Sequence, residues 1–439
     1  MRIAGAGLAG LCAAARAREL GGSPVVFEKG TRPGGSMLLS SGVIWRYREF
    51  EEFRAQCRGG DERLQRLVFD RLDEGLEWLE SLGAPVVARE TGNPLTSGVR
   101  FDPEGLTETL VRAAAEVRFG QPGTGTGTDT GTDTGTGTDC PLVLATGGFQ
   151  GDPELVERWV RPAAPLRVRA NPWSAGDGLR HGLASGAALS AGLDEFYGRN
   201  MADVDFGEDG FVSLAQVYGR FARIFNEQGE EFFDHTAVSW SEFDLVQATA
   251  HQPGARAWYL LDDAALDEQV RYGTVRELVA AAPTRTDPAE LPFEPPAGIV
   301  VAVRVAAAIT HTIGGLRVDD QARVLNEQDE PIDGLLAAGA DVGGISTGGY
   351  ASGLATALVL GRQAAETALS WRAAGRRSAA CRPEVGKARS SSRTAVPRPP
   401  RPRRRRRAPR PRARAARSRS SSRRSAGASG AGRSPRRGC

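Results

Sequence analysis

MRIAGAGLAGLCAAARARELGGSPVVFEKG, residues 1–30, is the stretch that decides the fold. A short apolar run opens it, and three glycines follow in G-x-G-x-x-G spacing: Gly5, Gly7 and Gly10. Residues 8–20 are rich in Ala and Leu and contain no Pro, which predicts a helix packed on a sheet. Residues 24–27 predict a second strand, which ends at Glu28. The stretch therefore predicts a strand, a glycine turn, a helix and a strand, the first unit of a Rossmann-like α/β fold.

This layout favours the binding of an adenine dinucleotide. The first glycine allows the tight turn, the second lets the backbone approach a pyrophosphate, and the third lets the helix pack closely on the strand. The helix N-terminus offers unpaired N–H groups to the anion, and Glu28 stands where an acid accepts hydrogen bonds from a ribose. Because all these features agree, we prefer a dinucleotide site to a merely glycine-rich turn. The residues assigned to it here are Gly5, Gly7, Leu8, Ala9, Gly10 and Glu28.

Length and charge bound the architecture. A chain of 439 residues is too long for one ordinary core and suggests two domains. The net charge of +3 hides two regions of opposite sign, because 24 of the 56 Lys and Arg lie from Arg372 onward beside a single acid, Glu384. Residues 1–371 keep 32 bases against 52 acids. An acidic body gives no reason to expect a nucleic-acid surface on the folded part.

The Arg-rich segment 372–439 has almost no aromatic residues and is predicted to be a disordered tail. A tail that binds RNA or DNA is the functional alternative, and out-of-frame translation of GC-rich DNA is a third interpretation. Residues 123–139 repeat Gly, Thr and Asp without an apolar side chain, and they predict a disordered segment or loose loop.

Five cysteines are scattered without C-x-x-C spacing: Cys12, Cys57, Cys140, Cys381 and Cys439. This usage is typical of a reducing compartment and argues against a disulfide or zinc framework. The chain starts directly in the first predicted strand, and no uncharged apolar run approaches the length of a membrane span. We therefore expect a cytoplasmic protein without a membrane partner.

Further motifs follow along the chain in a recognisable order. They are Gly34-Gly35-Ser36, Ser40-Ser41-Gly42, Ala145-Thr146-Gly147-Gly148, Ser174-Ala175-Gly176-Asp177-Gly178, His311-Thr312-Ile313-Gly314-Gly315 and Ala338-Gly339-Ala340-Asp341. With the opening turn, they resemble the fumarate reductase and succinate dehydrogenase flavoprotein family, which includes 3-ketosteroid dehydrogenases. The resemblance implies FAD as cofactor. It also implies non-covalent FAD, because Met37 stands where covalently flavinylated members have a histidine.

By this resemblance, further residues are expected to bind FAD: Lys29, Gly34, Gly35, Ser36, Ser41, Gly42, Ala145, Thr146, Gly147, Asp177, Gly339, Asp341, Gly353 and Leu354. Two of them have open alternatives. Asp177 either supports the flavin or only caps the helix that follows it. Relatives have Glu at the position of Ala340, where it bonds the ribitol chain, and Asp341 is the candidate one residue later.

The implied fold class is α/β, a Rossmann-like FAD-binding domain with an inserted α+β cap domain and a disordered C-terminal tail. The expected boundaries are 1–192 and 309–371 for the two parts of the FAD-binding domain, 193–308 for the cap (substrate) domain and 372–439 for the tail. Within the cap, Asn226-Glu227-Gln228-Gly229 predicts a hairpin turn. The proline-rich segment 275–296 is short for the helical part of such a cap, which suggests an incomplete cap.

The implied activity is that of an FAD-dependent dehydrogenase or reductase that adds or removes hydrogen across a carbon–carbon bond next to a carbonyl. Fumarate reductases have a proton-donating arginine where this chain has Val238 or Ser239, and a carboxylate-binding arginine where it has Tyr350. Fumarate is therefore a less favoured substrate. Ketosteroid dehydrogenases have a tyrosine at the latter position, which implies that Tyr350 polarises a substrate carbonyl.

His311, with Tyr197 or Arg199, is expected to transfer the proton or to anchor an acidic group. Tyr197 and Arg199 have the alternative of simply packing where the two domains join. The expected partners are a small-molecule substrate and an electron donor or acceptor that the sequence does not identify. Two other functions remain open: a catalytically impaired flavoprotein, and nucleic-acid binding through the basic tail.

Overall fold

The computed structural model describes residues 1–114, 116–124, 140–163, 165–270 and 273–373. Most of the Gly-Thr repeat and all but the first two residues of the Arg-rich tail lie outside these ranges. The predictions of disorder made for them, and the nucleic-acid function that depends on the tail, therefore stay predictions.

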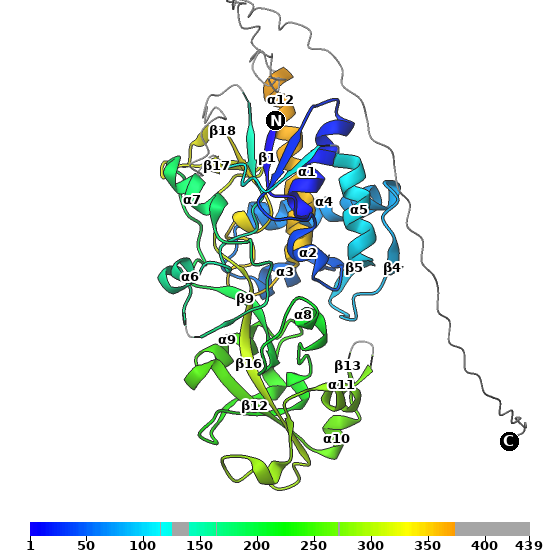
Figure 1. Ribbon diagram of the computed structural model, residues 1–439, viewed down its shortest axis with the longest axis vertical. Helices are drawn as coiled ribbons and strands as arrows, with labels where there is room; N and C mark the ends of the chain where they lie inside the picture. The colour runs from blue at the N-terminus through cyan, green and yellow to red at the C-terminus, as the bar shows by residue number, and fades with distance from the viewer. Residues whose placement is uncertain (115, 125–139, 164, 271–272, 374–439) are drawn as a thin grey trace, which may run out of the picture. The chain divides into compact units, whose positions relative to one another are not determined.

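The opening stretch forms the centre of a six-stranded sheet (Figure 1). Strand β1 (Arg2–Ala4) lies between β2 (Val25–Glu28) and β7 (Leu142–Leu144) and runs parallel to both. The sheet order is β17-β18-β7-β1-β2-β6, and only the β17–β18 pair is antiparallel. The other three strands are β6 (Val117–Phe119), β17 (Arg323–Leu325) and β18 (Pro331–Ala337), and β6 and β17 form the two edges of the sheet. The predicted Rossmann-like sheet is confirmed, and its carboxyl edge is the place where such sheets bind ligands.

Helices cover this sheet. The Ala-rich helix α1 (Leu8–Glu19) packs between α5 (Pro103–Ala114) and α12 (Gly353–Ala373), with α4 (Glu62–Ser81) against α12. Helix α5 ends at Ala114, and Val117 opens strand β6, where it pairs with Val26. A β-branched residue of this kind packs better on a sheet than in a helix.

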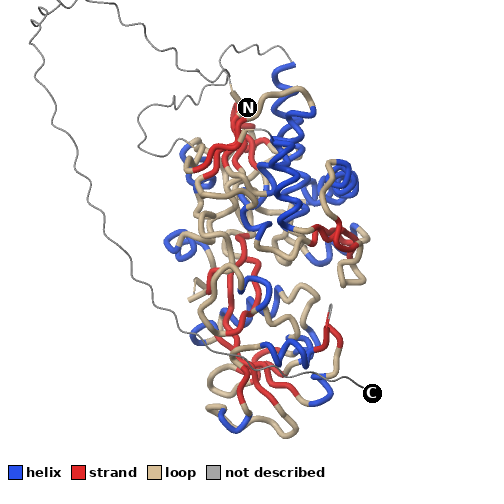
Figure 2. Tube along the Cα trace, turned by 45° about the vertical axis from the view of Figure 1, so that its right-hand side comes forward, coloured by secondary structure: helices blue, strands red, loops and turns tan. Residues whose placement is uncertain are grey.

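A second sheet has seven strands, in the order β11-β10-β12-β16-β15, with β8 and β9 also paired to β16. Figure 2 shows its strands as a group separate from the first sheet. The bounds are β8 (Arg167–Val168), β9 (Phe196–Ala202), β10 (Arg223–Phe225), β11 (Glu231–Phe233), β12 (Arg256–Leu261), β15 (Arg285–Thr286) and β16 (Val301–Thr312). The predicted hairpin turn is present, because the Asn226 side-chain oxygen accepts from the backbone N–H groups of Gln228 and Glu230. Strand β16 ends with His311 and Thr312.

The remaining elements are short. A three-stranded antiparallel sheet contains β3 (Val43–Tyr47), β5 (Thr96–Phe101) and β4 (Val86–Ala88), and β13 (Gln269–Val270) pairs with β14 (Gly273–Thr274). The helices are α2 (Gly35–Leu38), α3 (Phe50–Gln56), α6 (Pro153–Trp159), α7 (Asp177–Ala184), α8 (Gly210–Ser213), α9 (Phe243–Ala250), α10 (Asp263–Leu266) and α11 (Val275–Ala281). Within the described ranges, no helix combines the length and apolar character that a bilayer crossing needs.

The cysteines differ in state. Cys12 and Cys57 are buried and carry free thiols. Cys140 is disulfide-bonded, which the scattered spacing did not lead us to expect.

Candidate active site

The three glycines of the opening turn have different physical roles. Gly5 has φ +105°, and a Cβ there would lie 2.1 Å from the Ala145 carbonyl oxygen. A Cβ on Gly10 would lie 1.9 Å from the Gly5 carbonyl oxygen, so this glycine lets α1 pack on the turn. A Cβ on Gly7 would meet nothing within 4 Å among the described residues. The first and third glycines are thus needed by the fold, and the second leaves room beside the backbone for a ligand.

The start of α1 and Glu28 complete this end of the site. Gly7 caps the helix, whose first turn receives no capping side chain and holds no acid within the described residues. One Glu28 carboxylate oxygen accepts from Ala6 N–H at 2.8 Å and the other from Gly30 N–H at 2.7 Å. The acid therefore clamps the glycine turn to the end of β2. The open helix N-terminus suits a pyrophosphate, and the second lone pairs of the carboxylate suit ribose hydroxyls.

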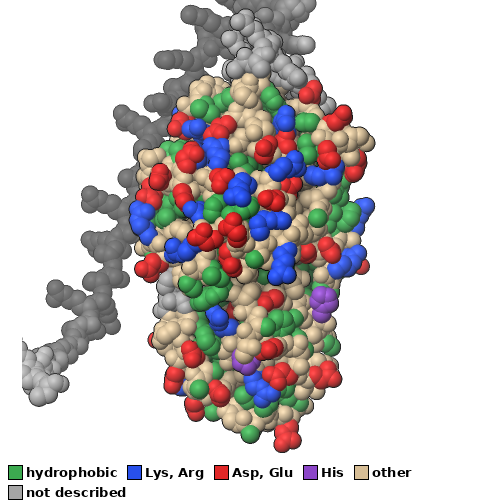
Figure 3. Space-filling model, turned by 180° about the vertical axis from the view of Figure 1, so that it is seen from behind, with side chains coloured by type: hydrophobic (Ala, Val, Ile, Leu, Met, Phe, Trp, Pro, Cys, Tyr) green, Lys and Arg blue, Asp and Glu red, His purple; other side chains and the backbone are tan. Residues whose placement is uncertain are grey.

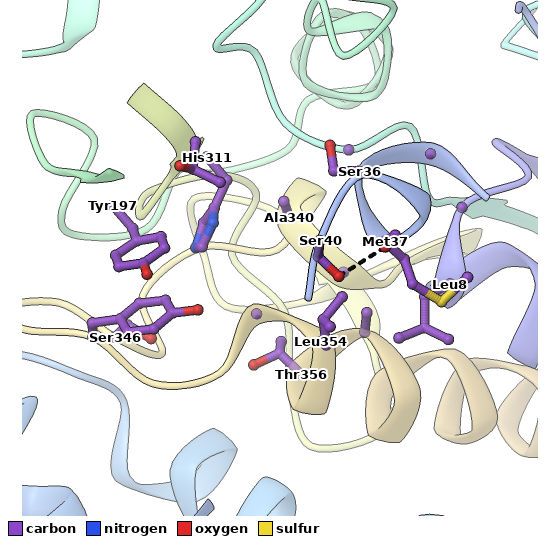
Figure 4. Close-up of a pocket in the computed structure, with 18 of the residues that line it drawn as sticks. Leu8, Ser36, Met37, Ser40, Tyr197, His311, Ala340, Ser346, Leu354 and Thr356 are labelled. Atoms are coloured by element: carbon purple, nitrogen blue, oxygen red, sulfur yellow. Dashed lines mark hydrogen bonds between the residues drawn. The ribbon is translucent and has the colours of Figure 1, made fainter. Parts of the chain in front are cut away.

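A cavity of about 430 Å³ runs from this turn to the end of β16. It is lined by sixteen of the predicted cofactor residues: Gly5, Gly7, Leu8, Ala9, Glu28, Lys29, Gly35, Ser36, Ser41, Ala145, Thr146, Gly147, Asp177, Gly339, Gly353 and Leu354. Figure 4 shows Leu8, Met37 and Ser40 on one side of the close-up and Tyr197 and His311 on the other. The structure thus brings the two groups of predicted residues to one cavity.

Four predicted cofactor residues do not line the cavity. Gly10 packs within the turn, and Gly34, at φ +102°, precedes α2. Gly42, at φ +72°, lies against the Phe101 carbonyl, which a Cβ would approach to 2.1 Å. Asp341 accepts from the Thr146 hydroxyl at 2.9 Å and from the backbone N–H groups of Thr146 and Gly148. Its carboxylate therefore holds the loop after β7, while burial raises its pKa to about 6.

Asp177 is not the cap of its helix. The capping position of α7 belongs to Gly176, and Asp177 is the first helical residue. Its carboxylate lies 2.6 Å from the Lys29 ammonium group. The N-cap alternative is therefore wrong, and the side chain instead ties the start of α7 to the end of β2.

The four candidate catalytic residues meet at the other end of the cavity. The rings of Tyr197 and Tyr350 stack with centroids 3.5 Å apart and planes at 7°, and the His311 ring lies 5.3 Å from Tyr197 and 5.9 Å from Tyr350. The Gly353 N–H at the start of α12 faces the Tyr350 hydroxyl and lowers its pKa, against the larger effect of burial. Tyr197 contributes to the electrostatics of both Tyr350 and Arg199, whose guanidinium lies 5.5 Å from the centre of the Tyr197 ring.

The surroundings of this cluster fix its protonation. Burial raises the pKa of Tyr350 well above its ordinary value, so its hydroxyl stays protonated at neutral pH. Burial also lowers the pKa of His311 to about 4, so its imidazole is neutral there. Arg199 pairs with Glu242 at 3.1 Å, and both side chains are buried. The cluster therefore offers neutral hydrogen-bonding groups and the Arg199 guanidinium, whose charge is balanced by the Glu242 carboxylate.

Several cavity residues were missed by the sequence analysis. They are Trp45, Tyr47, Gln150, Arg169, Trp173, Trp240 and Thr312. Arg169 donates to the Phe211 carbonyl at 2.7 Å and to the Thr310 hydroxyl at 3.0 Å. The buried Gln150 carbonyl oxygen and Thr312 hydroxyl have no hydrogen-bond partner among the described residues. A cofactor or a substrate that supplies partners would satisfy them, which fits a cavity built for a polar ligand.

Comparison with known proteins gives the class. The family model described as "FAD binding domain" matches residues 3–128 and 130–356. The chain therefore belongs to this family of FAD-binding proteins. The predicted cofactor, FAD, and the predicted class, an FAD-dependent oxidoreductase, are confirmed.

Individual relatives show the closer likeness. A probable fumarate reductase of Shewanella frigidimarina is 24% identical over 83% of this chain and 74% of its own length. The fold is similar to that of a flavocytochrome c3 fumarate reductase in its open conformation, with TM-score 0.63, 21% identity and coverage of 84% of this chain and 78% of the other. It is also similar to that of a 3-ketosteroid-Δ4-(5α)-dehydrogenase from Rhodococcus jostii RHA1, with TM-score 0.60, 19% identity and coverage of 84% and 96%.

Proposed function

We propose that the protein adds or removes hydrogen across a carbon–carbon bond next to a ketone carbonyl. The observation that carries this proposal is the position of the Tyr350 hydroxyl. It faces the Gly353 N–H, and its ring stacks on Tyr197 beside His311, in the same cavity as the glycine turn. A protonated phenol next to a helix N-terminus is a suitable donor to a carbonyl oxygen that gains charge during enolisation.

Different residues of the chain would bind FAD, polarise the substrate carbonyl and transfer the proton. The glycine turn, the start of α1 and Glu28 would hold the adenosine and pyrophosphate parts of FAD, and Gly353 and Leu354 at the start of α12 would lie along its ring. When bound, FAD supplies hydride transfer. Tyr350 would orient the substrate carbonyl and polarise it. The neutral His311 or the Tyr197 hydroxyl would take or give the proton at the neighbouring carbon.

The charge at this end of the cavity favours a ketone over a dicarboxylate. The relative from Shewanella frigidimarina is named as a probable fumarate reductase, but the arginine positions expected for fumarate are occupied here by Val238 or Ser239 and by Tyr350. Arg199 is compensated by Glu242. Arg169, which the sequence analysis missed, lines the cavity beside Thr310 and supports a second candidate, an unsaturated monocarboxylate.

Purification of the full chain tests the proposal directly. We expect a yellow protein with a flavin absorbance spectrum, whose pigment is released by acid precipitation because the FAD is not covalently bound. Cyclic ketones, fumarate and unsaturated monocarboxylates are then compared in a dye-linked screen. We expect a ketone to bleach or reoxidise the flavin. Turnover of carboxylates alone would replace the ketone with the second candidate. A flavoprotein that bleaches with none of these compounds would instead be catalytically impaired.

Three further assignments are proposals of the same kind. Residues 193–308 would form the cap domain, supported by a separate core under the second sheet that includes Tyr218, Ile224, Leu245, Tyr259 and Val303. A separate electron donor or acceptor would be the second partner, beside the substrate. The proposed location is the cytoplasm. On the face in Figure 3, Lys and Arg are interspersed with Asp and Glu, which gives no support to nucleic-acid binding by that face.

A further inference from the structure

Trp173 is a cavity residue for which the proposed reaction gives no role. Its side chain is half-buried and lines the cavity, and its backbone N–H donates to the Asn171 side-chain oxygen at 3.1 Å. The backbone N–H of Asn171 in turn donates to the Ser36 hydroxyl at 3.3 Å. The turn before α7 is therefore fixed to helix α2, and the indole has a defined position.

The indole lies at the ribose end of the cavity. A Cβ on Gly30 would lie 2.1 Å from Cε3 of the Trp173 ring, so the ring packs directly on the Gly30 backbone. Gly30 also donates its N–H to Glu28, the acid expected at the ribose. The Lys29–Asp177 ion pair, at 2.6 Å, joins the same two segments a few residues away. Glu28, Lys29, Trp173 and Pro122 together line this end of the cavity.

We propose that Trp173 is the wall on which the adenine ring of FAD stacks. The phosphates belong at the start of α1 and the ribose at Glu28, so the base continues past Glu28 toward Gly30 and the indole that covers it. A flat aromatic side chain is the surface that binds a base through its π-face, whatever the base's hydrogen-bonding edge. Gly30 is then required because any side chain there would displace the indole.

The selective loss of FAD over FMN tests this role, because FMN has the same ring and ribityl phosphate but lacks the adenosine. Apoprotein of the full chain is titrated with each flavin by the change in flavin fluorescence. Trp173→Ala should weaken FAD binding roughly tenfold to 100-fold and leave FMN binding unchanged. Trp173→Phe should retain most of the FAD affinity. AMP should compete with FAD on the original protein and not on Trp173→Ala.

Trp240→Ala is the matched control. Trp240 lines the same cavity, is 41% exposed and stacks with Arg220, whereas the indole that covers Gly30 is that of Trp173. It should change neither flavin's affinity. Equal losses of FAD and FMN affinity in Trp173→Ala, or no loss of either, would overturn the proposal. If that variant does not fold, Gly30→Ala supplies the same test by displacing the indole. Because only binding is measured, an error in the proposed reaction would leave the result intact.

Discussion

The two ends of the cavity are built in different ways. At the cofactor end, the backbone of the glycine turn lies along the cavity at Gly5 and Gly7, and Glu28 fixes that backbone. At the substrate end, side chains from distant parts of the chain make the surface: Trp45 and Tyr47 from β3, Tyr197 and Arg199 from β9, His311 from β16 and Tyr350 before α12. Substitutions at the cofactor end should therefore lower the stability of the fold and the binding of FAD. Substitutions at the substrate end should instead lower the rate of the reaction.

The largest expected effect is at Gly5. Gly5→Ala places a Cβ at φ +105° and 2.1 Å from a carbonyl oxygen, so we expect a loss of about 4 kcal/mol in the free energy of unfolding. Flavin binding should be lost with it. Urea denaturation and the flavin absorbance of the purified protein measure the two effects.

Gly7→Ala separates fold from cofactor at this end. Because its Cβ would meet nothing within 4 Å in the described chain, the apoprotein should unfold at the same urea concentration as the original protein. FAD binding alone should weaken. Equal destabilisation by the two substitutions would show that the comparison between the two glycines is wrong.

At the substrate end, the buried His311 should make stability depend on pH. Its pKa is about 4 in the folded protein, against an ordinary 6.5. Between these values the unfolded chain binds a proton that the folded protein does not, so stability falls as the pH falls from 6.5 to 4. The loss is about 3 kcal/mol at most. His311→Gln should remove this part of the pH dependence in urea denaturation.

The same experiment has an internal check. Asp341 has a pKa raised to about 6, so it contributes in the opposite direction in part of this window. It is present in both proteins and cancels in the difference between them. If the difference in the free energy of unfolding between the original protein and His311→Gln stays constant from pH 7 to pH 4, the imidazole is not desolvated in the folded protein.

The contrast between the ends also explains what the sequence alone could predict. A glycine turn, its helix and its acid lie within thirty residues, so local spacing predicted the cofactor end and the strand–helix–strand unit around it. Asp341 and Asp177 were harder, because which atoms a carboxylate bonds depends on loops that only the fold brings together. No spacing rule predicts that Tyr47 reaches the loop at Tyr350, 303 residues later.

Tyr350→Phe should reduce turnover by about 100-fold, because it removes the hydroxyl that we propose as the donor to the substrate carbonyl. The ring and its stacking on Tyr197 remain, so the flavin content and its spectrum should not change. Steady-state rates with a ketone substrate, normalised to bound flavin, measure the effect. Unchanged turnover would remove Tyr350 from the mechanism and leave His311 and Tyr197 as the chemical groups.

Tyr47→Phe should have a smaller effect on the same step. The Tyr47 hydroxyl donates to the Tyr350 backbone oxygen at 2.8 Å, and the Tyr47 ring packs edge-on against Trp45 at 5.3 Å. Burial raises its pKa, so the hydroxyl remains a donor. Losing this bond loosens the loop that carries Tyr350, and we expect about fivefold lower kcat with little change in KM.

Tyr218→Phe is the control that separates an effect on the position of Tyr350 from an effect on the stability of the fold. Its hydroxyl donates to the Gln216 side-chain oxygen at 2.7 Å inside the core of the second sheet, and Tyr218 does not line the cavity. Each variant loses one buried hydrogen bond, so both should lose about 1 kcal/mol in the free energy of unfolding. Only Tyr47→Phe should lower kcat. Equal rates in the two variants would mean that Tyr47 stabilises the fold without positioning Tyr350, and that the substrate end tolerates more movement than its side-chain construction implies.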